Sequence, residues 1–215
     1  MDEADVTIVD YGLGNILSVC RGLEYHGASV AISSDPSTIA TAKRLVLPGV
    51  GAFSAAMELL RSKSLADPVC AAAARNIPLL GVCVGMQLLF DESNEFGQTT
   101  GLGLIRGVVR PIPRLSVAGE RLKSPNIGWR PLMPTSDSKA WNDTILETTK
   151  PGEAAYFLHS FAAVCNSECN KLAISSYGGH EIVSVVSQGR IVGCQFHPEK
   201  SGAVGLKILG RFLQS

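Results

Sequence analysis

The chain has 215 residues, with 19 basic and 19 acidic side chains and a formal net charge of zero. This balance argues against nucleic acid or an anionic membrane as the main partner. No apolar run approaches the length that crosses a bilayer, and the acidic start, MDEADVTIVD, lacks the features of a signal peptide. Six cysteines without disulfide-framework spacing predict reduced thiols and a cytoplasmic protein.

Strands alternate with helices over the first ninety residues. We expect strands at 6–10, 29–33, 45–47 and 78–82, and helices from Asn15 to about Gly27, from Pro36, after PGVGAF and through VGMQLLF. Asn15 is a candidate cap for the first of these helices. The alternation predicts an α/β fold with a mostly parallel sheet and helices on both faces.

The second half of the chain is rich in short strand patterns. From Gly101 onward, apolar runs such as GVVRPIP, EIVSVVSQGR and IVGCQFHPE are separated by turn residues. We expect these runs to extend the sheet by antiparallel strands. The chain then closes with a helix whose candidate cap is Ser201. We expect one domain over residues 1–215.

The stretch GVCVGMQ places a cysteine where a strand turns into a helix. Cys83 follows the strand 78–82, at the edge of a parallel sheet where ligands bind. The pattern G-x-C-x-G is the thiol form of the nucleophile elbow, in which Gly81 and Gly85 leave room for a sharp turn. The first peptide of the helix, at Val84, offers an N–H group to an oxyanion. Cys83 is therefore a candidate nucleophile.

A thiol nucleophile needs a base, and QFHPEK supplies a candidate. Pro198 favours extended backbone at His197, and residues two apart in an extended chain point to the same side. His197 and Glu199 are therefore expected to face each other, with the carboxylate orienting the imidazole. The preceding strand, IVGCQ, delivers the pair to the same sheet edge as Cys83.

Several motifs together resemble class I glutamine amidotransferases, above all the glutaminase subunits of imidazole glycerol phosphate synthase. They are DYGLGN, PGVGAF, GVCVGMQLLF, IGW, YFLHSF and GCQFHPEKSG, in this order. The resemblance covers essentially the whole chain. It implies that Cys83 attacks the side-chain amide of L-glutamine, that His197 moves the protons, and that Glu199 orients His197. The products would be glutamate and ammonia.

The same resemblance implies the remaining roles in the site. The loop 48–51, with Val50 and Gly51, would provide the second oxyanion donor beside Val84. Gly49, Gln87 and the backbone near Ser160 would contact the substrate. The resemblance implies no metal or cofactor, and it implies a heterodimer with a (β/α)8-barrel synthase or cyclase that uses the ammonia for imidazole glycerol phosphate in histidine biosynthesis.

One residue departs from the pattern of these subunits. They typically have asparagine after GW, where this chain has Arg130. The triad is unaffected, but the ammonia acceptor is put in doubt, and sugar amidation in surface-polysaccharide assembly is the alternative. Two further interpretations remain open: a silent glutamine-binding subunit, and a metal protein that uses Cys165 and Cys169. The GLG of DYGLGN lacks the third glycine of a dinucleotide site and predicts a turn.

Overall fold

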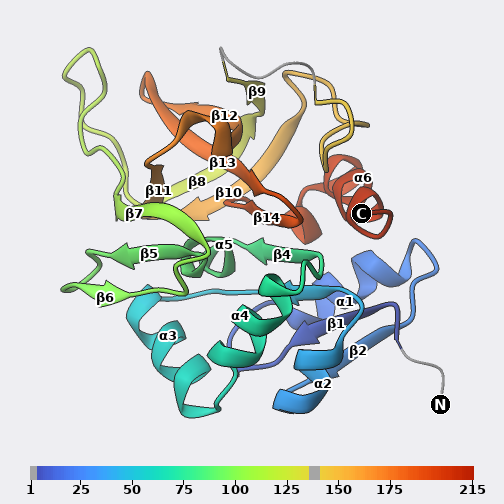
Figure 1. The fold of residues 1–215 in the computed structure, drawn as a ribbon. Helices are drawn as coiled ribbons and strands as arrows, with labels where there is room; N and C mark the ends of the chain where they lie inside the picture. Colours follow the sequence, from blue (N-terminus) through green and yellow to red (C-terminus); the bar gives the residue numbers. More distant parts are fainter. Residues whose placement is uncertain (1–3, 136–140) are drawn as a thin grey trace.

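An eight-stranded sheet forms the centre of the computed structural model, which describes residues 4–135 and 141–215 (Figure 1). Its order is β2-β1-β3-β4-β14-β13-β12-β9. The first five strands are parallel and the last three are antiparallel to their neighbours. The strands are β1 (Val6–Val9), β2 (Val30–Ser33), β3 (Leu45–Leu47), β4 (Leu79–Val82), β9 (Met133–Pro134), β12 (Lys171–Tyr177), β13 (His180–Gln188) and β14 (Ile191–Cys194).

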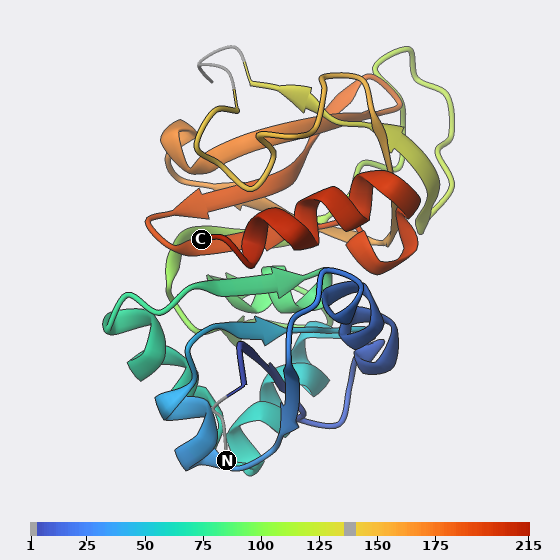
Figure 2. The ribbon, with the colours of Figure 1, turned by 90° about the vertical axis from the view of Figure 1, so that its right-hand side faces the viewer.

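Helices cover both faces of the parallel strands, as predicted. The chain runs in one direction along the sheet from β1 to β2 and in the other from β2 through β3 to β4. Right-handed crossovers therefore place the connecting helices on opposite faces. Figure 2 shows α1 and α6 side by side, and α2 packs against α4. The helices are α1 (Ile16–Glu24), α2 (Pro36–Thr41), α3 (Phe53–Ser62), α4 (Ala66–Ala74), α5 (Val84–Leu88) and α6 (Gly202–Phe212). None of the described helices is long and apolar enough to cross a bilayer.

The segment between β3 and β4 contains two helices, where the sequence predicted one. α3 ends at Ser62 and α4 begins at Ala66. Between them Ser64 adopts a left-handed backbone conformation, with φ of 57°. An α-helix cannot continue through such a residue, so the chain changes direction there.

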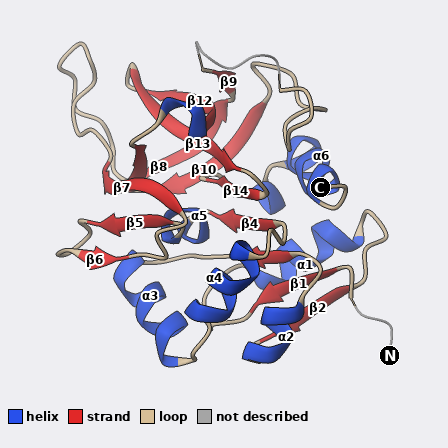
Figure 3. Ribbon diagram, viewed as in Figure 1, coloured by secondary structure: helices blue, strands red, loops and turns tan. Residues whose placement is uncertain are grey.

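The second half extends the central sheet only in part. β12, β13 and β9 extend it as expected, but two further sheets form beside it. One is the antiparallel pair of β8 (Asn126–Pro131) and β10 (Ala154–His159). The other has the order β11-β7-β5-β6, with β5 (Phe90–Ser93), β6 (Thr99–Thr100), β7 (Ile105–Pro111) and β11 (Phe161–Cys165). Figure 3 shows β8, β10 and β11 in the upper half of the molecule, β5 and β6 at about the level of β4, and most of the helices in the lower half.

The pairing of β4 with β14 positions the candidate site. These strands are parallel neighbours, with Cys194 in register with Val82. Their carboxyl ends therefore lie at the same sheet edge: Cys83 follows β4 at once, and His197 follows β14 after two residues. Both strand ends are anchored in one apolar core that includes Val82, Cys194 and Phe196.

Candidate active site

Cys83 occupies a strained turn between β4 and α5. Its backbone has φ of 54° and ψ of −111°, a combination that is uncommon outside glycine. The Cys83 N–H donates to the carbonyl of Cys194 at 2.8 Å, which ties the turn to the neighbouring strand. A side chain held in this way is aimed by the backbone, as in a nucleophile elbow.

The flanking glycines provide the clearance that the sequence predicted. A Cβ at Gly81 would lie 2.7 Å from the carbonyl oxygen of Gly85. A Cβ at Gly85 would overlap the carbonyl oxygen of Leu47 on β3. Both obstacles are backbone atoms, so neither can be moved by a change of side-chain rotamer.

His197 and Glu199 meet as expected, although the backbone between them differs from the prediction. The extended chain ends at His197, and Pro198–Lys200 form a 3₁₀ turn (η2). His197 Nδ1 lies 2.9 Å from Glu199 Oε1, and both side chains are buried. The carboxylate is thus placed to hold the orientation of the ring.

Asn15 contributes to this pair in a way that the sequence did not predict. Its side chain does not cap α1. Instead, Asn15 Nδ2 donates to Glu199 Oε1 at 3.3 Å. Ser201 likewise makes no cap bond to α6. Its hydroxyl donates to the His197 carbonyl at 2.7 Å and accepts from the Tyr156 N–H at 2.9 Å.

The surroundings of His197 favour the protonated imidazole. Burial by itself lowers the pKa of this histidine, but the hydrogen bonds and charges of Cys83 and Glu199 outweigh burial and raise the pKa to about 10. An imidazolium beside the sulfur stabilises a thiolate by charge attraction. The arrangement can therefore hold a thiolate nucleophile and a proton donor together.

A cavity of about 210 Å³ opens at the sheet edge and brings most of the predicted site residues together. Of the predicted oxyanion and substrate residues, Val50, Gly51, Val84, Gln87 and Ser160 line it. Gly49 lies behind the wall, where a Cβ would come within 2.5 Å of the Gly85 nitrogen. The full lining is Val50, Gly51, Cys83, Val84, Gln87, Glu95, Pro125, Leu158, His159, Ser160, Phe161 and His197.

Three polar residues of the site were missed from the sequence, namely Glu95, Gln195 and His159, which lines the cavity from the end of β10. Glu95 is buried, lines the cavity, and accepts the Phe53 N–H at 2.7 Å. Gln195 is fully buried, and its Nε2 lies 3.9 Å from Cys83 Sγ. The position of Gln195, two residues before His197, was the available signal. For Glu95 no local signal exists, because DESNE offers three acids of the same kind.

The DYGLGN segment packs against the predicted oxyanion loop. The hydroxyl of the buried Tyr11 donates to the Pro48 carbonyl at 2.8 Å. Gly14 has φ of 127°, and a Cβ there would lie 2.8 Å from Pro48 Cβ. Gly14 thus allows close approach to loop 48–51, in agreement with the predicted turn.

Among the described residues, no three His, Cys, Asp or Glu side chains gather where they could hold a metal. Cys165 is buried, and burial raises the pKa of its thiol to about 11. The side chain of Cys169 lies outside the described residues.

Comparisons with known proteins identify the family of the chain. The family profile described as "Glutamine amidotransferase class-I" matches residues 7–214. "Imidazole glycerol phosphate synthase subunit HisH 1" of Legionella pneumophila (strain Lens) is 46% identical over 98% of this chain and 99% of its own length. "Imidazole glycerol phosphate synthase subunit HisH" of Geobacillus sp. (strain WCH70) is 45% identical over 96% of this chain and 95% of its own.

Solved structures share the fold at low sequence identity. A crystal structure of a glutamine amidotransferase superposes with a TM-score of 0.72 at 18% identity, covering 97% of both chains. PurLQS from Thermotoga maritima gives a TM-score of 0.66 at 18% identity, covering 97% of this chain and 96% of the other. The chain belongs to the class I glutamine amidotransferase family and, within it, to the HisH subunits of imidazole glycerol phosphate synthase.

Proposed function

We propose that Cys83, His197 and Glu199 hydrolyse the side-chain amide of L-glutamine to glutamate and ammonia. One observation carries this proposal: the elbow thiol and the imidazole face the same cavity, and the imidazole is held by a buried carboxylate. This is the arrangement that nucleophilic acyl transfer requires. Family membership supports the same reaction.

The polar residues of the cavity suit the amino-acid end of glutamine. The Glu95 carboxylate offers a negative charge to the α-ammonium group. The Gln87 amide nitrogen is engaged by the Phe161 carbonyl at 2.9 Å and by Gln195 Oε1 at 3.0 Å. Its amide oxygen is therefore turned away from these acceptors and can accept from the ammonium. Backbone N–H groups near Ser160 would bind the α-carboxylate.

The proposed reaction has two acyl-transfer steps. The Cys83 sulfur attacks the amide carbon, and the tetrahedral oxyanion collapses as imidazolium of His197 gives its proton to the departing nitrogen. Ammonia leaves and a thioester remains. His197 then takes a proton from water, the resulting hydroxide attacks the thioester, and glutamate leaves as the pair of Cys83 thiolate and His197 imidazolium is restored.

The oxyanion of both steps needs two donors. The Val84 N–H, at the start of α5, is one. Loop 48–51 would supply the other through the peptides of Val50 and Gly51. Gly51 has φ of 90°, so the loop uses a conformation that side chains disfavour. Each such donor contributes about 10²–10³ to the rate.

An exposed apolar face beside the cavity suits a partner subunit. Ile127 and Trp129 on β8 are each 53% exposed, and Leu158 on β10 is 38% exposed. Ile127 pairs with Leu158 across the two strands, and Leu158 also lines the cavity. We infer that a (β/α)8-barrel synthase covers this face and receives the ammonia there. The names of the relatives favour imidazole glycerol phosphate in histidine biosynthesis as its product over sugar amidation.

Labelling with the diazoketone analogue of glutamine tests the chemistry. Mass spectrometry should find one added group, on Cys83, and Cys83→Ala should take up none. Labelling of another cysteine, with Cys83 unmodified, contradicts the proposal. Trp129→Ala should abolish stimulation of glutamate release by the synthase partner, whereas Ile32→Ala, on the remote edge strand β2, should leave it unchanged.

A further inference from the structure

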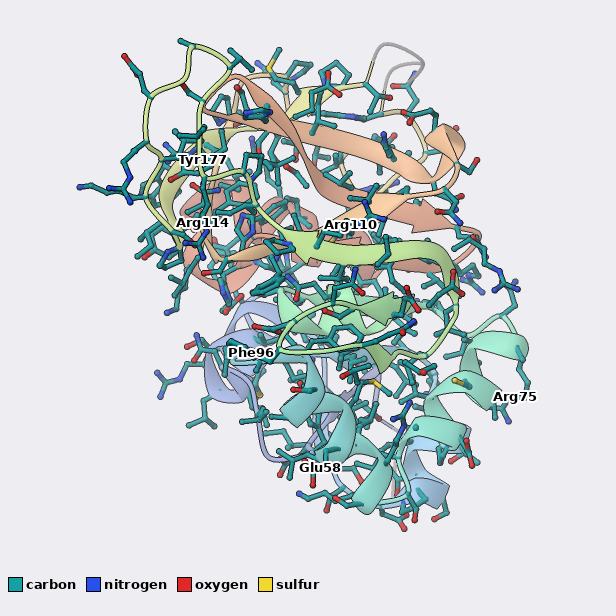
Figure 4. The ribbon with its side chains drawn as sticks, turned by 90° about the vertical axis from the view of Figure 1, so that its left-hand side faces the viewer. Glu58, Arg75, Phe96, Arg110, Arg114 and Tyr177 are labelled. Atoms are coloured by element: carbon teal, nitrogen blue, oxygen red, sulfur yellow. The ribbon has the colours of Figure 1, made fainter. Side chains whose placement is uncertain are left out.

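Arg130 is the residue that departs from the usual pattern, and its side chain is firmly held. Its Nε donates to Asn126 Oδ1 at 3.1 Å. Its guanidinium carbon lies 5.2 Å from the centre of the Tyr177 ring, a distance typical of a cation–π contact. Figure 4 shows Tyr177 in the β-rich half of the molecule, away from the helical half that carries Glu58 and Arg75.

The contact with Arg130 sets the orientation of a buried amide. A guanidinium can only donate hydrogen bonds, so the oxygen of the Asn126 amide must face it. The amide nitrogen then points to the other side, where His159 Nε2 lies at 3.1 Å. Asn126 is fully buried and pairs with His159 across β8 and β10, so the two side chains are held beside each other.

The Asn126 amide and the Phe161 carbonyl together fix the tautomer of His159. Because Asn126 Nδ2 donates, His159 Nε2 must accept, and the ring proton lies on Nδ1. His159 Nδ1 donates to the Phe161 carbonyl at 2.9 Å. Burial lowers the pKa of His159 to about 4. The hydrogen bond to Phe161 acts to raise this pKa, and the charges of His197 and Arg130 lower it further.

The Phe161 carbonyl connects this series of hydrogen bonds to the nucleophile. It also accepts from Gln87 Nε2 at 2.9 Å, and the same nitrogen donates to Gln195 Oε1 at 3.0 Å. Gln195 Nε2 lies 3.9 Å from Cys83 Sγ. Continuous hydrogen bonds thus run from Arg130, through the cavity wall, to the reacting sulfur.

We propose that Arg130 is a positioning residue for the glutamine pocket: it orients the Asn126 amide, holds His159 in the neutral Nδ1–H form, and so fixes the wall at Phe161 and Gln87. The proposal rests on the proposed use of this cavity for glutamine. It also gives the departure at position 130 a role. An asparagine or glutamine there can accept as well as donate, and would leave the orientation of the Asn126 amide undetermined.

The test compares Arg130→Met, which removes the donor, with Arg130→Lys, which keeps a donor-only side chain. Two-dimensional ¹H–¹⁵N spectra of the imidazole nitrogens in the full chain report the His159 tautomer without any need for turnover. Wild type and Arg130→Lys should show the Nδ1–H form. Arg130→Met should show a mixture of tautomers and a His159 titration midpoint above about 4, because the freed amide can turn and accept from Nε2–H.

Kinetics provide the second readout. Arg130→Met should raise the KM for glutamine about five- to tenfold, the effect of losing one hydrogen bond, with little change in kcat. As the pH is lowered, the KM of Arg130→Met should begin to rise at a higher pH than the KM of wild type, because its His159 takes up a proton more easily. If Arg130→Met folds poorly, Asn126→Asp serves instead. A carboxylate there accepts from both neighbours, and should move the His159 midpoint above its ordinary value of about 6.5.

Three results would overturn the proposal: an Nε2–H tautomer in the wild type, an unchanged tautomer in Arg130→Met, or an unchanged midpoint in Asn126→Asp. A wild-type chain that shows the Nδ1–H tautomer but never hydrolyses glutamine, even with a partner, would contradict the proposed glutaminase function. It would leave the proposed role of Arg130 in orienting Asn126 and His159 intact.

Discussion

Glu199→Gln separates the charge of the triad carboxylate from its hydrogen bonds. Glu199 Oε1 accepts from His197 and from Asn15, at 2.9 and 3.3 Å. Oε2 is buried and has no hydrogen-bond partner among the described residues. A glutamine amide therefore keeps its oxygen toward the two donors and turns its nitrogen to the Oε2 side. Both hydrogen bonds persist, and only the negative charge is lost.

The expected fall in kcat/KM of Glu199→Gln follows from the lost negative charge. A hydrogen bond to a charged group contributes about 1.5–3 kcal/mol, and a neutral one about 0.5–1.5 kcal/mol. The loss of about 1.5 kcal/mol corresponds to roughly tenfold in rate, and the dry surroundings of His197 increase it. We expect kcat/KM to fall about 10- to 100-fold. His197→Ala removes proton transfer itself, and should lower the rate further, by about 10³ or more.

The pH profile gives an independent check on the same variant. The pKa of His197 is raised to about 10, so the imidazolium persists up to that pH and is lost above it. Removing the Glu199 charge lowers this pKa. The alkaline limb of the activity profile should therefore move to lower pH.

The assay is glutamate release with the synthase partner and its substrate present. Glu58→Gln, an exposed change on α3, serves as the matched control and should equal wild type. Wild-type activity in Glu199→Gln would remove Glu199 from the triad. A loss as large as that of His197→Ala would show that the carboxylate does more than supply charge.

Three further predictions concern the elbow and the loop. Cys83→Ala should abolish hydrolysis while circular dichroism and the melting temperature stay near wild type, because little volume is lost; retained hydrolysis would exclude Cys83 as nucleophile. Gly85→Ala should lower the free energy of unfolding in denaturant titrations by about 3 kcal/mol or more, since its Cβ meets the Leu47 backbone, whereas Gly119→Ala, in open space, should cost about 1 kcal/mol. We expect loop 48–51 to turn its N–H donor away from the oxyanion until a substrate-loaded partner binds, so the isolated chain should release glutamate about 10²–10³ times more slowly than the complex. Equal rates would refute this activation by the partner.

The nucleophile and its base could be predicted because their local sequence encodes their geometry. Small residues at 81 and 85 are required wherever a strand turns so sharply into a helix. Proline after His197 restricts the backbone enough to bring Glu199 near the ring, even though the turn proved to be 3₁₀ rather than extended. Such features depend on neighbours in the chain, which a sequence displays directly.

The features that were missed depend on neighbours in space. Asp91, Glu92 and Glu95 look alike in the sequence, but Asp91 binds Arg106, Glu92 binds Gln98, and only Glu95 lines the cavity. Asn15 precedes a helix as a cap would, yet its amide reaches Glu199 because η2 packs beside α1. The break at Ser64 requires a left-handed serine, which propensity alone does not foretell.

The pairing of β4 with β14 has a consequence for how the family can vary. The ladder between these strands fixes the separation of Cys83 and His197. The length of the intervening segment, residues 84–193, does not set that distance. Insertions or deletions in the connection between β7 and β8 therefore leave the catalytic spacing intact. That connection forms part of the rim near the cavity, since Pro125 lines it. The surface around the pocket is thus free to be remodelled for different partners while the chemistry underneath stays constant.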